Sequence, residues 1–173
     1  ARDKNVLNMF CYTGGFSFYA MRGGAHLVHS VDSSAKAIEL TNRNVELNFP
    51  GDTRHQAFCE DAFRYLEQAG SQYNLIILDP PAFAKHRGAL HNALKGYTRL
   101  NHKAFQKIQS GGILFSCSQV VTKDHFRNAV FTAAAQAGRQ VRILHQLHQP
   151  ADHPINIYHP EGEYLKGLVL YVE

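Results

Sequence analysis

The chain of 173 residues is about the length of one domain, and with 45% hydrophobic residues it can bury most of its apolar surface around a single core. Its net charge of +4 favours a polyanionic partner such as nucleic acid, although many ordinary enzymes are equally basic. No apolar run approaches the roughly 20 residues that span a bilayer, and the first residues, ARDKN, lack a signal-peptide profile, so we expect a cytoplasmic protein with no membrane span.

Short apolar runs alternate with segments of helical period along the chain. The apolar runs predict strands near 5–10, 27–31, 54–58, 73–79, 112–117, 140–147 and 165–172. The segments between them predict helices over 15–22, 34–48, 61–69, 95–109 and 123–137. We therefore expect one α/β domain over residues 1–173, with a mainly parallel seven-stranded sheet, helices on both faces and an antiparallel hairpin at the sheet edge.

The first predicted strand ends in VLNMFCYTGGFS, which leads into a helix as a nucleotide-binding loop does. Phe10 and Tyr12 stand where a dinucleotide-binding loop has glycines, because that backbone must approach a pyrophosphate. A cofactor with an adenosine but no phosphate, such as S-adenosylmethionine, does not need that approach. We expect Gly14 and Gly15 to suffice for the turn, with the helix N-terminus facing the methionine carboxylate.

Acidic residues follow the next two predicted strands. Asp32 ends LVHSVD, about as far beyond Gly14 as a ribose-binding carboxylate lies in nucleotide-binding folds, and Ser33 or Ser34 is the expected N-cap of the helix after it. Asp61 follows the third strand, where we expect it beside an adenine edge. Capping and solvation at helix starts explain each carboxylate singly, but their series after consecutive strands favours one cofactor pocket.

The fourth strand ends in NLIILDPPAFAK, where two prolines fix the backbone and hold Asp79 at the pocket rim. An Asp-Pro-Pro-aromatic sequence suits a methyltransferase that acts on a flipped nucleobase, with Asp79 accepting from the amino group and Phe83 stacking. Lys85, His86 and Arg87 are candidates for phosphate contacts. The alternative is a strand-terminating turn with a solvated aspartate.

The fifth strand ends in GGILFSCSQV, which places Cys117 beside Asp79 if the two strands are neighbours. Such a thiol gains some exposure, and the dipole of the following helix is expected to lower its pKa. A lone cysteine is more often a small core residue. The three cysteines form no CxxC pair, and His145 and His148 lie far from carboxylate or thiolate partners, so we expect neither disulfide nor metal site.

The motifs together resemble a known family. VLNMFCYTGGFSFYA, SVDSSAKAIELTNRNVELN, EDAF, LDPPAFAK, FSCS, ADHP and PEGEYLKG look like the catalytic domain of bacterial large-subunit ribosomal RNA cytosine methyltransferases. These are S-adenosylmethionine-dependent enzymes of the Rossmann-like class I fold that form 5-methylcytosine. The first motif is shared with rRNA guanine methyltransferases, whereas DPPAFAK and SCS are more specific.

The resemblance implies roles for individual residues. It implies that Cys117 is the nucleophile, that Asp79 binds the base, and that Pro80, Pro81, Phe83 and Lys85 contact the substrate. The cofactor-binding residues that it implies are Asn8, Phe10, Tyr12, Thr13, Gly14, Gly15, Asp32, Ser33, Asp61, Ala62 and Asp79. Family members carry an N-terminal PUA domain that binds RNA, so we expect this chain to be the C-terminal catalytic part of a longer protein, with weak, salt-sensitive RNA binding alone.

The resemblance predicts methyl transfer to carbon 5 of a cytosine in rRNA. Three alternatives remain at this stage: methylation of a base nitrogen, as in guanine, with Cys117 only structural; a non-catalytic domain that binds RNA or the cofactor; and, last, an oxidoreductase that uses NAD. The oligomeric state is open.

Overall fold

The computed structural model describes residues 1–83, 90–159 and 162–173. The strands are β1 (Asn5–Met9), β2 (Leu27–Asp32), β3 (His55–Cys59), β4 (Leu75–Leu78), β5 (Gly112–Ser118), β6 (Val141–Leu147) and β7 (Lys166–Val172). The helices are α1 (Gly15–Arg22), α2 (Ala35–Asn48), α3 (Ala62–Gln68), α4 (Leu90–Lys107) and α5 (Lys123–Gln136).

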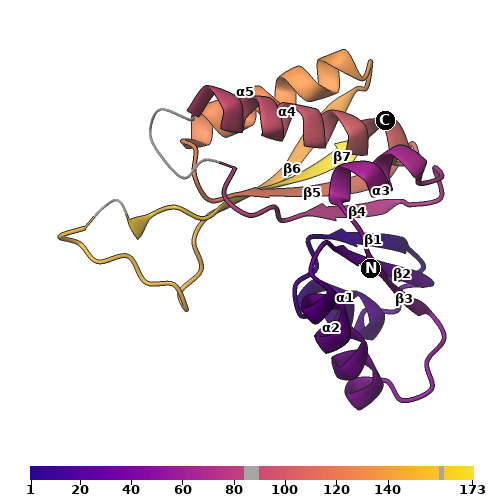
Figure 1. Ribbon diagram of the computed structural model, residues 1–173. Helices are drawn as coiled ribbons and strands as arrows, with labels where there is room; N and C mark the ends of the chain where they lie inside the picture. Colours follow the sequence, from indigo (N-terminus) through magenta and orange to yellow (C-terminus); the bar gives the residue numbers. More distant parts are fainter. Residues whose placement is uncertain (84–89, 160–161) are drawn as a thin grey trace.

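The strands form one seven-stranded sheet in the order β3-β2-β1-β4-β5-β7-β6. β1 to β5 run parallel, and β7 is antiparallel to both β5 and β6. The predicted α/β fold with its antiparallel edge hairpin is therefore confirmed. β6 runs in the same direction as β5, so the connection from β6 emerges at the edge where the parallel strands have their carboxyl ends, and its described residues project away from the sheet (Figure 1).

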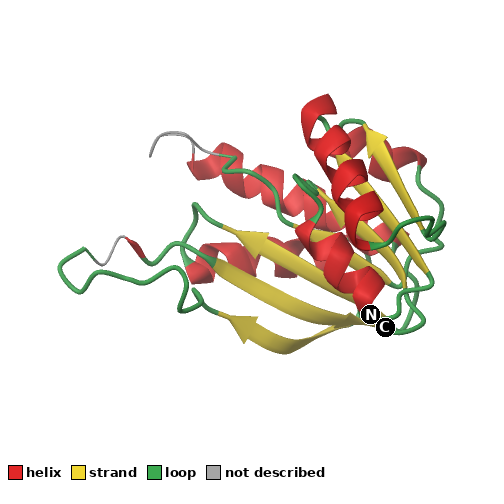
Figure 2. Cartoon of the chain, turned by 90° about the horizontal axis from the view of Figure 1, so that it is seen from below, coloured by secondary structure: helices red, strands yellow, loops and turns green. Residues whose placement is uncertain are grey.

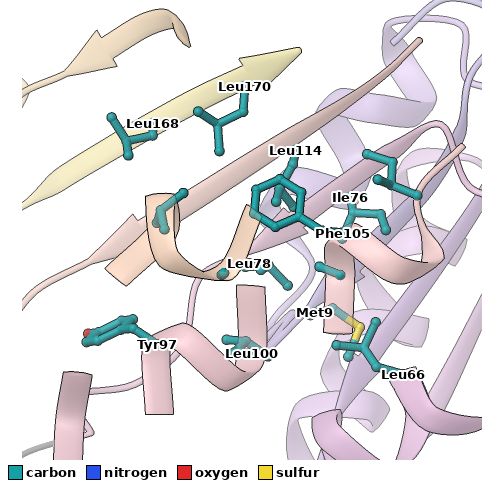
Figure 3. Close-up of a cluster of buried hydrophobic side chains, with 14 of the residues drawn as sticks. Met9, Leu66, Ile76, Leu78, Tyr97, Leu100, Phe105, Leu114, Leu168 and Leu170 are labelled. Carbon is teal, nitrogen blue, oxygen red and sulfur yellow. The ribbon is translucent and has the colours of Figure 1, made fainter. Parts of the chain in front are cut away.

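The helices cover the two faces of the sheet unequally. α3, α4 and α5 pack on one face and α1 and α2 on the other, over β1 to β3 (Figures 1 and 2). The larger core lies under α3, α4 and α5, and Figure 3 shows part of it: Met9, Leu66, Ile76, Leu78, Tyr97, Leu100, Phe105, Leu114, Leu168 and Leu170. Complete burial of such a side chain contributes about 1.5–3 kcal/mol, so this core stabilises the packing of the three helices on the sheet.

Most predicted elements end within two residues of the observed ones, and one does not. α4 begins at Leu90, five residues before the predicted start, because Ala93 already faces the core and extends its apolar stripe. The open choice of N-cap for α2 is settled by Ser34, whose Oγ accepts from the backbone N–H of Ala37 at 3.3 Å. No helix in the described part of the chain is long and apolar enough to cross a membrane.

A largely buried series of hydrogen bonds connects α1 to β2 and β3. The Ser17 and Ser30 hydroxyls lie 2.7 Å apart, and Ser30 Oγ lies 2.8 Å from Nε2 of His55. Burial, with a smaller effect of His29, lowers the pKa of His55 from 6.5 to about 4, while Asp52 opposes the shift. His55 is therefore neutral in the folded protein at neutral pH.

We expect this histidine to make folding stability depend on pH. Between pH 6.5 and about 4 the unfolded chain binds more protons than the folded one, so the contribution of His55 is complete above pH 6.5 and is lost as the pH falls. The loss amounts to about 3 kcal/mol. Urea unfolding at several pH values measures the free energy of unfolding. This free energy should depend less steeply on pH in His55→Asn than in the wild type, whereas the exposed-site variant His145→Asn should behave like the wild type. Equal slopes for all three proteins would contradict the expectation.

Candidate active site

The loop after β1 contains three residues in the left-handed region, Phe10 (φ 60°), Tyr12 (φ 49°) and Gly14 (φ 90°). At Gly14 a Cβ would lie 2.8 Å from Cζ of Phe18, so this position needs glycine. At Gly15 a Cβ would meet nothing within 4 Å. The turn therefore forms without glycines beyond these two: Phe10 and Tyr12 share the left-handed geometry, Gly14 is sterically required, and Gly15 is not.

Asp32 fixes this loop from the end of β2. Its Oδ2 accepts from the backbone N–H of Tyr12 at 3.0 Å, and its Oδ1 accepts from that of Ser34 at 2.9 Å. A third hydrogen bond comes from Thr41, whose hydroxyl donates to the Tyr12 carbonyl at 2.8 Å. A carboxylate has about four lone-pair sites. The half-buried Asp32 thus keeps acceptor capacity for a pair of ribose hydroxyls.

Other predicted cofactor residues have definite structural tasks. Asp61 is the N-cap of α3, and its Oδ1 accepts from the backbone N–H groups of Phe63 and Arg64 at 2.9 and 3.0 Å, which leaves the exposed side chain a second oxygen. Asn8 is fully buried and donates to Ser17 Oγ at 2.9 Å. Ala62 is buried in the larger core. Thr13 is half-buried beside the loop and Ser33 is exposed next to Asp32.

Asp79 and Cys117 lie at adjoining strand ends. Leu78 of β4 pairs with Ser116 of β5, and each is followed by one of the two residues. Both line a cavity of about 380 Å³ at the carboxyl edge of the sheet. We call it the edge cavity; its walls include Phe16, Asp79, Phe115, Cys117, Leu147 and Lys166. The predicted proximity of carboxylate and thiol is thus present.

The electrostatics of this pair differ from the sequence-based expectation. Burial raises the pKa of the Cys117 thiol well above its ordinary range, and the negative charge of Asp79 raises it further. Burial also raises the pKa of Asp79. The prediction of a lowered thiol pKa is therefore wrong, because α5 begins only at Lys123, several residues beyond Cys117, and burial disfavours the charged thiolate.

The Asp-Pro-Pro segment is only partly as predicted. Pro80 is buried and Pro81 exposed. Phe83 does not face the edge cavity: its ring packs against that of Tyr97, with centroids 4.9 Å apart, and lies 6.5 Å from that of Phe63. The predicted phosphate contacts Lys85, His86 and Arg87 fall outside the described residues.

The walls of the edge cavity include residues that the sequence reasoning missed. Phe115 precedes Cys117 by two positions on β5 and so shares its face of the sheet, a periodicity that would have identified it. Phe16 and Leu147 come from distant segments, and no local pattern indicates them. Among the described residues no group of three or more His, Cys, Asp or Glu side chains is arranged to hold a metal ion.

A family model and two curated relatives indicate methyl transfer as the shared chemistry. A family model described as S-adenosylmethionine-dependent methyltransferase matches residues 1–163. A protein of Tolumonas auensis named ribosomal RNA large subunit methyltransferase I is 45% identical over 98% of this chain and 44% of its own length. The protein of the same name from Aeromonas hydrophila is 44% identical over 96% of the chain and 43% of its own length. The chain thus spans less than half the length of these relatives.

Solved structures share the fold. SMU.776, described as a methyltransferase and crystallised as a complex with SAH, superposes with a TM-score of 0.85 at 26% identity, covering 99% of this chain and 46% of its own. TrmN from Thermus thermophilus superposes with a TM-score of 0.71 at 16% identity, over 98% of this chain and 44% of its own, which supports the fold alone.

Proposed function

Because this chain belongs to the S-adenosylmethionine-dependent methyltransferases, we propose that it transfers the methyl group to carbon 5 of a cytosine in large-subunit rRNA through a covalent adduct of Cys117. The names of its relatives support an rRNA substrate, which would place the protein in the cytoplasm. The observation that carries the proposal is the position of Asp79 and Cys117 at adjoining strand ends in the wall of one cavity.

The residues at the ends of β1 and β2 fit the cofactor. The left-handed loop leaves open space over Gly15, and Asp32 retains acceptor capacity for ribose hydroxyls. Asp61 keeps one oxygen for the adenine edge, and the first turn of α1 presents backbone N–H groups to a carboxylate. When bound, S-adenosylmethionine supplies the electrophilic methyl group that carbon 5 takes up.

The electronic problem is that carbon 5 of cytosine is a weak nucleophile. We assign to Cys117 the addition to carbon 6, which shifts the ring electrons toward ring nitrogen 3 and makes carbon 5 an enamine carbon. Because the thiol is protonated in the free protein, its proton must leave during the addition. Asp79 is the neighbouring acceptor, and a carboxylate with a raised pKa takes that proton and delivers it to nitrogen 3.

Carbon 5 loses its own proton after methylation, to Asp79 or to a water molecule. The carbon–sulfur bond then breaks, the ring double bond returns, and the proton on nitrogen 3 goes back to sulfur. Apart from the methyl group, the net change is the release of one proton. Asp79 also holds the amino group of the cytosine, which fixes the ring beside the thiol.

One observation favours the alternative of nitrogen methylation. The raised thiol pKa suits an inert, structural cysteine as well as a nucleophile activated only on substrate binding. In that case Asp79 orients a guanine or another base whose nitrogen accepts the methyl group. Mass spectrometry of rRNA nucleosides from cells with and without the gene separates the two functions: loss of 5-methylcytosine supports our proposal, and loss of a nitrogen-methylated base supports the alternative.

We expect Asp32→Ala to weaken S-adenosylmethionine binding by about 1–3 kcal/mol, because a buried ribose hydroxyl pair loses its acceptor. Isothermal titration calorimetry measures the change. Asp52→Ala is the matched control, since Asp52 pairs with Arg54 away from the loop. An unchanged affinity for Asp32→Ala, or tighter binding of NAD than of S-adenosylmethionine by the wild type, would contradict the assignment of the pocket.

A further inference from the structure

Phe83, the aromatic residue that the sequence assigns to base stacking, is not among the residues that line the edge cavity with Cys117. Its ring contacts Tyr97, and its Cδ2 atom lies 3.2 Å from where a Cβ of Gly96 would be, so it fills a gap on the core side of α4. The edge cavity has a different aromatic wall. On the basis of the proposed function, we infer that the target nucleotide binds in the edge cavity with its base stacked on Phe16 and its phosphate at Lys166.

The edge cavity has the size and lining for a nucleotide. Its volume of about 380 Å³ falls within the range of roughly 300–1,000 Å³ that is typical of small-molecule pockets. Asp79 and Cys117 provide polar groups at one wall, while Phe16, Phe115 and Leu147 provide apolar surface. A planar base needs such apolar surface on its faces and polar groups at its edge.

Phe16 lies in the first turn of α1 with 39% of its surface exposed. It contacts Phe115 edge to face, with the ring centroids 5.7 Å apart and the planes at 85°. Phe115 packs closely over Gly167, where a Cβ would come within 2.8 Å of the Phe115 ring. Phe115 therefore backs a partly exposed Phe16 ring, which offers a stacking surface that accepts any base.

Lys166 supplies a cation in the wall of the edge cavity. It begins β7 opposite Ser118 of β5, is half-buried, and donates to the Tyr164 carbonyl at 2.6 Å. The nearby carboxylate of Glu163 is engaged by Lys123 at 2.6 Å, and within the described ranges Lys166 itself forms no ion pair. Burial and the charge of Lys123 lower the pKa of Lys166, and Glu163 opposes them. A bound anion would therefore stabilise the charged form of Lys166. A phosphate oxygen is such an anion.

The test measures nucleotide binding rather than methylation. Cytidine 5′-monophosphate and cytidine are titrated by NMR into the protein saturated with S-adenosylhomocysteine. Phe16→Leu should weaken binding of both ligands roughly 5- to 150-fold, the value of one stacked base, while the matched variant Phe83→Leu should leave both affinities unchanged. Lys166→Gln should remove the preference for the phosphorylated ligand, whereas Lys95→Gln, on α4, should retain it.

Four results would overturn the inference: wild-type affinity in Phe16→Leu, weaker binding in Phe83→Leu alone, a preserved phosphate preference in Lys166→Gln, or no nucleotide binding by the wild type at millimolar concentration. Guanosine 5′-monophosphate separates this inference from the proposed function. Suppose that guanosine 5′-monophosphate binds with the same dependence on Phe16 and Lys166 and that the cytidine ligands do not bind. The edge cavity is then the nucleotide site as inferred, and the proposed cytosine substrate is wrong.

Discussion

Replacing Cys117 by alanine is expected to abolish methyl transfer and to leave S-adenosylmethionine binding intact. Without the thiol nothing adds to carbon 6, so carbon 5 stays too weak a nucleophile, whereas the cofactor residues on the β1 and β2 loops are untouched. The expected loss is complete within the detection limit of a radiolabelled methyl assay on large-subunit rRNA. Calorimetry on the same variant checks that the cofactor still binds.

A covalent trap tests the same step directly. RNA that carries 5-fluorocytosine should form an adduct with the wild-type protein that survives denaturing electrophoresis, because the fluorinated carbon has no proton to lose after methylation. Peptide mass spectrometry should locate the RNA on Cys117. Cys59→Ala is the matched control, because it removes an exposed thiol at the end of β3 and should still form the adduct. Methylation by the alanine variant at 117, or an active enzyme without an adduct, would favour nitrogen methylation.

The positions of the elements could be predicted from the sequence because apolar period and strand length are local signals. The strands follow directly from short apolar runs, and parallel connections place Asp32, Asp61 and Asp79 at one edge of the sheet. The start of α4 was missed because its first turn, at Leu90, follows a polar stretch and gives no strong capping signal.

The orientation and electrostatics of the site could not be predicted in the same way, since they depend on contacts between distant segments. Phe83 turns inward because Gly96, on another element, has no side chain to block it. The pKa of Cys117 rises because the strand ends and the β6–β7 segment enclose it, which no local sequence feature indicates. Phe16 and Lys166 come close to the same cavity only through the strand order.

Asp79→Asn is expected to slow the chemical step by about 10² to 10⁴-fold, the usual contribution of a general acid–base group. The asparagine keeps the shape of the side chain but cannot take the thiol proton or deliver it to ring nitrogen 3. The appropriate measurement is the rate of adduct formation with 5-fluorocytosine RNA under single-turnover conditions, because it isolates thiol addition and methylation from product release.

The pH dependence of that rate distinguishes proton transfer from simple positioning. In the wild type the carboxylate takes the thiol proton, so the rate should be level around neutral pH and fall only as acid protonates Asp79 through its raised pKa. In Asp79→Asn the thiolate must form without that acceptor. Because burial still holds the Cys117 pKa above its ordinary range, the fraction of thiolate, and with it the rate, should rise about tenfold per pH unit between pH 7 and 9. A slow variant whose rate is level across that range would mean that Asp79 only positions the base and that another group deprotonates the thiol.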